Sequence, residues 1–196
     1  MKNKLFQNLI LFGHKSSGKT FFGSLLAQEL GRIFIDTDQW IENLYKNEFQ
    51  ETCNCRQIAI KIGEAKFRNL EMRVIDDLID LKQAIIAVGG GTVLNPENCS
   101  KLEKIGNLVY LEADKETIKC RIFNSGIPSF LDSKDSNKSF DKMYEERKPI
   151  YEKIPAFKIK MHEKTTPQIL EELKTLHSQI IEHQRVNLIT PTYKDS

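Results

Sequence analysis

Residues Gly13-His14-Lys15-Ser16-Ser17-Gly18-Lys19-Thr20 match the pattern G-x-x-x-x-G-K-[ST] at every required position. An apolar run, Leu9–Phe12, precedes them, and a stretch with helical spacing, Lys19–Leu30, follows and ends at Gly31. This order of strand, glycine loop and helix is the setting of a phosphate-binding loop, or P-loop. We therefore expect all eight residues from Gly13 to Thr20 to hold the phosphates of ATP.

The chemistry of phosphate explains the spacing of this loop. Glycine lets the backbone approach phosphate oxygens closely, and successive N–H groups and the helix N-terminus favour negative charge. We expect Lys19 to reach the β- and γ-phosphates and the Thr20 hydroxyl to bind Mg²⁺. The alternative is a chance match in a loop before a helix, which the flanking strand and helix make improbable.

A P-loop does not identify the acceptor of the phosphoryl group. Small-molecule kinases, ATPases, GTPases and regulatory switches share it. The chain lacks an obvious N-K-x-D sequence for guanine, and 196 residues are few for a motor with accessory domains. The motif and the length favour a phosphotransferase.

Short apolar runs alternate with helical patterns along most of the chain. Runs of this length and composition suit strands that are buried on both faces of a parallel sheet, so the pattern predicts an α/β fold. Besides Lys19–Leu30, helices are expected at Glu64–Leu81 and from Thr166, with the latter's apolar stripe at Ile169, Leu173, Leu176 and Ile180. The expected strands are Leu9–Phe12, Ile33–Ile35, Ala84–Val88, Leu108–Leu111 and Phe157–Met161.

Two segments stand apart from this alternation. Residues 124–139 are rich in Ser, Asp, Asn and Lys and are expected to form a loop or lid. After Gln184 the helical periodicity is lost, so residues 185–196 are expected to be a flexible tail. Residues 1–184 are then a single P-loop kinase domain.

Composition excludes several classes of partner. The charged residues, 29 basic and 27 acidic, give a net charge of only +2, which argues against a nucleic-acid or anionic-membrane surface. No apolar run approaches the ~20 residues needed to cross a bilayer. The four cysteines fit free thiols in a reducing compartment, so we expect a cytoplasmic protein.

Asp36-Thr37-Asp38 directly follows the second expected strand. At the carboxyl end of a strand, both carboxylates can face the crevice in which α/β sheets bind ligands. One can hold the hydration shell of a metal ion, and the other can orient an acceptor hydroxyl and take its proton. The alternative is that Asp38 only caps a helix that begins near Gln39.

Three consecutive glycines, Gly89–Gly91, follow the third expected strand. They indicate a backbone that closely approaches a ligand or another segment, although a plain flexible turn stays open. Arg68 and Arg147 are the remaining basic residues that stand out in the sequence, and the arginine side chain suits bidentate binding of a carboxylate. The ordinary alternative for both is a surface position without a function.

Taken together, these motifs resemble those of the shikimate kinase family, in the same order, over roughly Leu9–Lys160. Besides the P-loop, the matching residues are Asp36 and Asp38, Gly63-Glu64 with Phe67-Arg68, Gly89–Gly91, and the R-x-P-x-Y sequence Arg147–Tyr151. The resemblance implies a five-stranded parallel sheet of strand order 2-3-1-4-5 and phosphorylation of the shikimate 3-hydroxyl by ATP. We expect a monomer of this fold.

The resemblance also implies roles for single residues. Asp38 holds the shikimate ring hydroxyls and serves as the acceptor-side base, and Arg68 and Arg147 clamp the substrate carboxylate. The Gly89–Gly91 backbone lines the same pocket. Asp36 lies near Mg²⁺, bound through water, and Arg121 lies near the adenine.

The chain departs from the family pattern at two positions. Where the family carries a lid arginine, this chain has Ile127, and Lys15, Lys134 or Lys138 are candidate replacements for its charge. Lys15 is the replacement we expect to be catalytic, beside Lys19 and Asp38. Ser16 stands where the family has glycine, which costs about 1 kcal/mol if φ is positive there.

Three other functions stay open at this stage. The chain could be another small-molecule kinase of the same fold, such as a gluconate kinase or a nucleoside monophosphate kinase. It could be a non-catalytic nucleotide-binding regulator, which the missing lid arginine alone supports. A polynucleotide kinase fits least, because the charge is nearly neutral.

Overall fold

The computed structural model describes residues 8–125, 131 and 135–189. Its strands form one parallel sheet in the order β2-β3-β1-β4-β5, which confirms the predicted topology. Each strand lies within two residues of its predicted bounds. The strands are β1 (Asn8–Phe12), β2 (Phe34–Asp36), β3 (Ile85–Ala87), β4 (Gly106–Glu112) and β5 (Phe157–Lys160).

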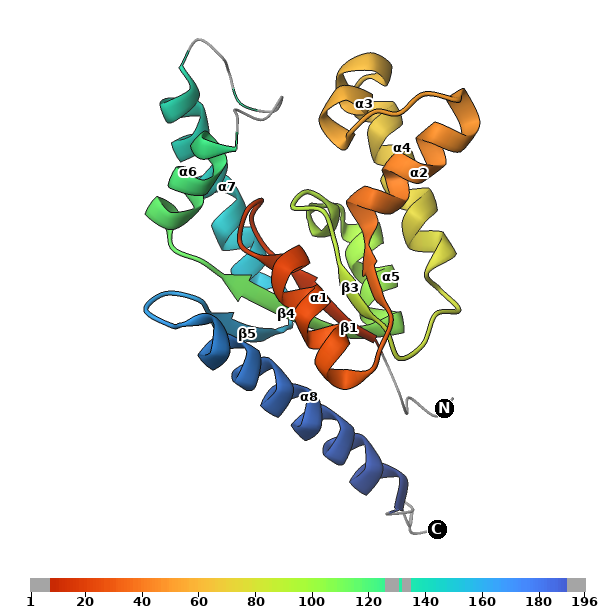
Figure 1. Cartoon of the computed structure of the whole chain (residues 1–196), viewed down its shortest axis with the longest axis vertical. Helices are drawn as coiled ribbons and strands as arrows, with labels where there is room; N and C mark the ends of the chain where they lie inside the picture. Colours follow the sequence, from red (N-terminus) through yellow and green to blue (C-terminus); the bar gives the residue numbers. More distant parts are fainter. Residues whose placement is uncertain (1–7, 126–130, 132–134, 190–196) are drawn as a thin grey trace, which may run out of the picture.

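Helices cover both faces of this sheet (Figure 1). Those N-terminal to β4 are α1 (Lys19–Leu30), α2 (Thr37–Phe49), α3 (Cys55–Ile62), α4 (Glu64–Asp77), the 3₁₀ turn η1 (Thr92–Leu94) and α5 (Pro96–Ile105). The later ones are α6 (Lys115–Asn124), α7 (Ser136–Lys153) and α8 (Thr166–Ile189). The helix predicted to end at Leu81 therefore ends four residues earlier.

The central strand β1 divides the core into two apolar layers. Its side chains alternate between the faces of the sheet, as strand geometry requires. Leu9 and Leu11 pack with α1 and α8. Ile10 and Phe12 pack with residues of α4, α5 and α7. All of β1 is buried, and each large apolar side chain of this kind contributes ~1.5–3 kcal/mol to stability.

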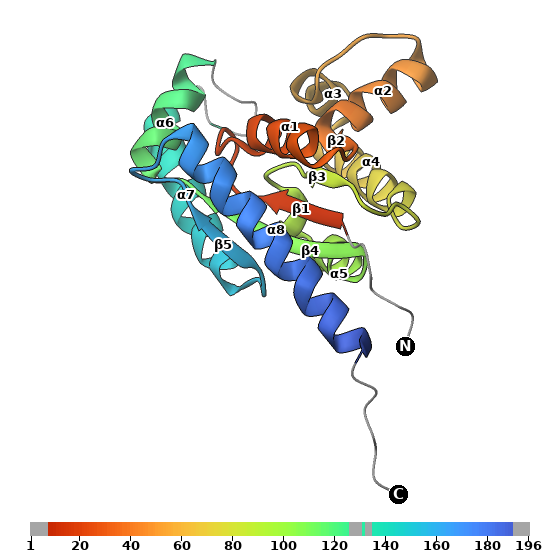
Figure 2. The same cartoon turned by 60° about the horizontal axis from the view of Figure 1, so that its bottom comes forward.

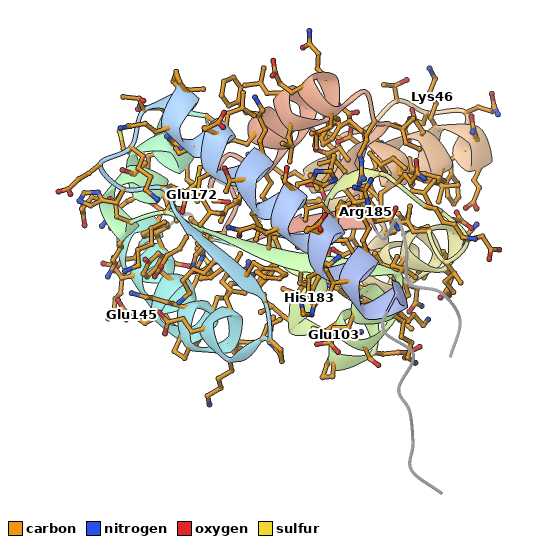
Figure 3. All side chains as sticks on the ribbon, turned by 90° about the horizontal axis from the view of Figure 1, so that it is seen from below. Lys46, Glu103, Glu145, Glu172, His183 and Arg185 are labelled. Carbon is orange, nitrogen blue, oxygen red and sulfur yellow. The ribbon has the colours of Figure 1, made fainter. Side chains whose placement is uncertain are left out.

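Helix α8 docks along one face of the sheet through its predicted apolar stripe (Figure 2). Ile169, Leu173, Leu176 and Ile180 are all buried there. Seen from below, Glu172 lies toward the start of the helix and Arg185 toward its end (Figure 3). The helix continues to Ile189, so the first five residues of the predicted tail at 185–196 are helical, and residues 190–196 lie outside the described residues. Within the described ranges, no helix combines the length and apolar character needed to span a bilayer.

The parallel strands bring three sequence motifs to one edge of the sheet. The P-loop follows β1, the Asp36–Asp38 segment follows β2, and the Gly89–Gly91 segment follows β3. On one side of this edge, α2, α3 and α4 pack around a small apolar cluster of their own. On the other side, α6 and α7 share a second cluster (Figure 1). The motifs therefore lie between two helical walls.

Candidate active site

The P-loop connects β1 to α1 with a backbone that needs its two glycines. Gly13 and Gly18 have φ of 141° and 98°, which side chains rarely tolerate. A Cβ at Gly13 would also lie 2.8 Å from the carbonyl oxygen of Leu111. Ser16 adopts φ of 65°, so the serine at this position carries the expected strain.

Lys19 lies buried beneath this loop. Its Nζ donates to the carbonyl oxygens of Gly13, at 3.1 Å, and His14, at 2.8 Å. Burial lowers the pKa of Lys19 to about 8, although the nearby carboxylates of Asp38 and Asp36 act against this shift. The ammonium group therefore contacts the loop and is within electrostatic range of the two acidic residues.

His14 braces the loop against α7. Its ring stacks on Tyr144, with centroids 4.5 Å apart, and meets Tyr151 edge-on at 4.8 Å. Among the described residues, neither ring nitrogen has a hydrogen-bond partner. Burial, together with the charge of Arg147, lowers the pKa of His14 to about 3. Because Tyr151 Oη also donates to the carbonyl of Gly90 at 2.5 Å, α7 connects the P-loop to the glycine segment.

The two aspartates after β2 have different environments. Asp36 accepts from the Thr20 hydroxyl at 2.6 Å and from the Asp38 backbone N–H at 2.9 Å. Asp36 thereby caps α2, so the alternative that Asp38 caps this helix is wrong. Burial, with the charge of Asp36, raises the pKa of Asp38 to about 6. A carboxylate with such a pKa suits proton abstraction near neutral pH.

A side chain anywhere in the Gly89–Gly91 segment would crowd a neighbouring group. A Cβ at the first, second or third glycine would lie 2.8 Å from Asp38 Oδ1, 3.2 Å from the backbone nitrogen of Lys15, or 2.7 Å from Arg68 Nη1, respectively. None of the three glycines has positive φ, so the constraint on these positions comes from the neighbouring groups and not from the backbone conformation. The segment approaches three predicted site residues, which contradicts the alternative of a plain flexible turn.

Arg68 is held by two carboxylates of its own helix. It forms ion pairs with Glu64 and with Glu71, and Glu71 also accepts from the Thr92 hydroxyl at 3.0 Å. Glu71 is 4% exposed and was not predicted from the sequence. The signal was present, because a glutamate three residues after Arg68 falls on the buried stripe of α4. The buried Glu71 carboxylate thus holds the half-buried guanidinium of Arg68 at the cavity wall.

These groups surround one cavity of about 380 Å³. The P-loop, the two aspartates, the glycine segment and both predicted arginines contribute to its lining. Residues that sequence analysis did not predict also line it, most of them from α3 and α4. The predicted members are Lys15, Ser16, Lys19, Thr20, Asp36, Asp38, Arg68, Gly89, Gly90, Gly91 and Arg147; the additional ones include Cys55, Arg56, Ala59 and Glu71.

A second hollow lies on the other side of the P-loop. Arg121 of α6 reaches this loop and donates to the carbonyl of Ser16 at 3.1 Å. Arg121 lines the hollow together with Phe21 of α1 and Thr166 at the start of α8. The two hollows share the P-loop residues Ser16, Lys19 and Thr20, so a bound molecule in each would meet at this loop.

The predicted lid at 124–139 is shorter than expected at both ends. Helix α6 includes Asn124, and α7 already begins at Ser136. Leu131 is buried against the α6–α7 cluster. Lys138 lies in the first turn of α7, whereas Ile127 and Lys134 lie outside the described residues.

The fold and the loop define the class of this protein. A P-loop at the edge of a 2-3-1-4-5 parallel sheet, open to a cavity with acidic and basic side chains, is the site of a P-loop kinase that uses ATP as co-substrate. The sequence model of the family described as "Shikimate kinase" matches residues 15–177. The chain therefore belongs to the shikimate kinase family, as its motifs predicted.

Curated relatives agree with this assignment. The shikimate kinase of Alkaliphilus oremlandii is 36% identical over 169 residues, which cover 85% of this chain and 96% of the relative. The shikimate kinase of Caldanaerobacter subterraneus is 34% identical over 167 residues, covering 85% and 94%. The residues matched by the family model, 15–177, include α2, α3 and α4, the glycine segment, and α6 and α7.

Solved structures share the fold as well. A shikimate kinase from Acinetobacter baumannii superposes with a TM-score of 0.79 at 26% identity, over 90% of this chain and 95% of the other. A gluconokinase from Sinorhizobium meliloti has a TM-score of 0.61 over 92% and 97%, but only 12% identity. The likeness to the gluconokinase concerns the fold alone. The family model and the curated relatives therefore favour shikimate kinase over gluconate kinase.

Proposed function

We propose that this protein transfers the γ-phosphoryl group of ATP to the 3-hydroxyl group of shikimate. The product, shikimate 3-phosphate, leads to chorismate and the aromatic amino acids. One observation carries the proposal: a single cavity joins the phosphate-binding loop and Lys19 to Asp38, Arg68, Arg147 and the glycine segment. In addition, the structurally similar Acinetobacter baumannii kinase was solved in complex with shikimate.

The acceptor side of this cavity suits a polyhydroxylated carboxylic acid. Asp38, with its raised pKa, would bind ring hydroxyls and accept the proton of the attacking one. Arg68 and Arg147 would bind the carboxylate, and the Gly89–Gly91 backbone would pack against the ring. Holding the hydroxyl in line with the γ-phosphorus would supply most of the rate enhancement.

The nucleotide side uses the loop and two further cations. Lys19 would bind the β- and γ-phosphates, since its Nζ already lies at the loop carbonyls. Lys15, which lines the acceptor cavity, would stabilise the transferring phosphoryl group in place of the family's lid arginine. Arg121 would lie at the adenine in the second hollow, where it already contacts the loop.

Thr20 and Asp36 suit Mg²⁺ at the end of the loop. A hydroxyl and a carboxylate oxygen lie 2.6 Å apart there, and Mg²⁺ prefers hard oxygen ligands. Among the described residues there is no cluster of three metal-binding side chains. This fits the way Mg²⁺ is usually held in kinases, by one or two protein oxygens together with phosphates and water. The ion would supply charge neutralisation of the phosphates.

We also propose a cytoplasmic monomer without nucleic-acid or membrane partners. The near-neutral net charge of +2 supports the absence of such partners. All four cysteines are free thiols, which suits a reducing compartment.

A panel of acceptors tests the proposed reaction. ADP release is measured with ATP and Mg²⁺ and with shikimate, gluconate or AMP as acceptor, and the phosphorylated product is identified by mass. We expect turnover with shikimate at least 100-fold above that with the other two. Turnover with gluconate or AMP but not with shikimate would mean that the acceptor is a different molecule. ATP binding without turnover on any acceptor would favour a non-catalytic nucleotide-binding regulator.

A further inference from the structure

Arg56 lies in the acceptor cavity although no motif points to it. It is the second residue of α3 and lines the cavity together with Asp38 and Arg68. The capping box of Asn54 and Gln57, with reciprocal hydrogen bonds of 2.9 Å, fixes the first turn of this helix. The backbone that carries Arg56 is therefore firmly placed at the cavity.

The residue before Arg56 ties this turn to the acceptor aspartate. The Cys55 backbone N–H donates to Glu42 at 2.9 Å, and its thiol donates to the carbonyl oxygen of Asp38 at 3.3 Å. Burial, together with the charge of Asp38, raises the pKa of the Cys55 thiol, which keeps the group protonated and able to donate. The start of α3 is thus held on the acceptor side of the cavity.

The guanidinium of Arg56 has no partner in the part of the chain that the structure describes. Within residues 8–125, 131 and 135–189, no hydrogen bond, ion pair or ring contact involves this guanidinium. Neighbouring cations differ in this respect: Lys61 on the same helix pairs with Glu51, and Arg73 pairs with Glu48. An exposed, unpaired arginine at a cavity wall can bind an anionic ligand without first giving up a protein partner.

The charges of the cavity wall show what Arg56 adds. Among the residues that the structure describes, five basic side chains line the cavity, Lys15, Lys19, Arg56, Arg68 and Arg147, and four acidic ones, Asp36, Asp38, Glu64 and Glu71. Glu64 and Glu71 already offset the charge of Arg68. Without Arg56 the described part of the wall would have equal numbers of both signs, so Arg56 supplies its excess positive charge, which suits an anionic acceptor.

We propose that Arg56 is a third arginine of the acceptor site and binds the carboxylate of the acceptor. This rests on the proposed function, since it assumes an acceptor that carries a carboxylate. Arg68 is held in place by its own carboxylates, whereas Arg56 is free to close over the ligand from α3. Its contact is made equally in the ground state and the transition state, so it sets the KM for the acceptor and not kcat.

Steady-state kinetics of Arg56→Gln test this assignment. We expect the KM for shikimate to rise about tenfold, as for a lost charge-assisted hydrogen bond, with kcat and the KM for ATP within twofold of wild type. Arg73→Gln is the matched control, because Arg73 is an exposed arginine outside the cavity, and it should leave all three constants unchanged. With the neutral carboxamide of shikimate, wild type and Arg56→Gln should become equal.

Three results would overturn the assignment. An unchanged KM for shikimate would remove Arg56 from the site, and a loss in kcat alone would place its action on the transferring phosphoryl group. If Arg56→Gln raised KM equally for shikimate and for its carboxamide, the role of Arg56 would be merely structural. Arg56→Lys provides a further check, because it keeps the positive charge and should raise the KM for shikimate only a few-fold. These results can be told apart from a failure of the proposed function, because in that case the wild-type protein itself would show no turnover with shikimate.

Discussion

The buried His14 imidazole makes the stability of this protein depend on pH in a way that one substitution can isolate. His14 is 1% exposed and has a pKa of about 3, lowered by burial and by the charges of Arg147, Lys19 and Lys148. Its ordinary pKa is 6.5. Between these values the unfolded chain binds a proton that the folded chain excludes, so the free energy of unfolding decreases as the pH falls from 6.5 toward 3.

The size of this effect follows from the shift in pKa. One pH unit corresponds to about 1.4 kcal/mol, and pH 5 lies roughly 1.5 units below the unfolded pKa. The His14 contribution to stability is therefore about 2 kcal/mol lower at pH 5 than at pH 8. His14→Phe removes the titrating group but keeps an aromatic ring on Tyr144. The difference in the free energy of unfolding between the variant and wild type should therefore shift by about 2 kcal/mol in favour of the variant when the pH is lowered from 8 to 5.

Urea denaturation of both proteins at the two pH values measures this difference. Tyr144→Phe is the control, because it keeps both the stack and His14 and should therefore retain the wild-type dependence on pH. If His14→Phe loses as much stability as wild type between pH 8 and pH 5, the imidazole does not lie neutral in the core, and the reasoning is refuted.

Three further predictions concern the walls of the acceptor cavity. Asp38→Asn should raise the free energy of unfolding at pH 8 by about 1–3 kcal/mol, since the raised pKa means that the ionised carboxylate opposes folding above about pH 6; equal or lower stability in urea would contradict this. Gly91→Ala should displace Arg68 and raise the KM for shikimate about tenfold, and an unchanged KM would show that the 2.7 Å approach does not matter. Ser16→Val should lose about 1–2 kcal/mol of stability and Ser16→Gly none, because φ is 65° there, and equal stabilities of the two variants in thermal unfolding would refute positive φ.

Local signals allowed the sequence to predict much of the fold. The P-loop, with its leading strand and following helix, lies where the pattern placed it, and α1 has the predicted bounds. The apolar runs locate the strands because both faces of a parallel sheet are buried. The strand order came from the resemblance to the family and not from the periodicity of the sequence.

The remainder depends on tertiary packing and was therefore missed or misjudged. Asp36 and Asp38 are two residues apart, so which of them caps α2 depends on the exact residue at which β2 ends. Glu71 and Arg56 reach the cavity only because α3 and α4 fold back over the sheet edge. The continuation of α8 to Ile189 lies beyond Ile180, the last buried residue of its apolar stripe, so the periodicity of the sequence did not indicate it.

The most direct test of the central claim is turnover by Asp38→Asn with ATP, Mg²⁺ and shikimate, measured beside shikimate binding by calorimetry. The claim is that Asp38 takes the proton of the acceptor hydroxyl in the cavity next to the P-loop. We expect kcat to fall at least 100-fold, as for a lost general base, while shikimate still binds. Wild-type turnover in Asp38→Asn would contradict this account of the site.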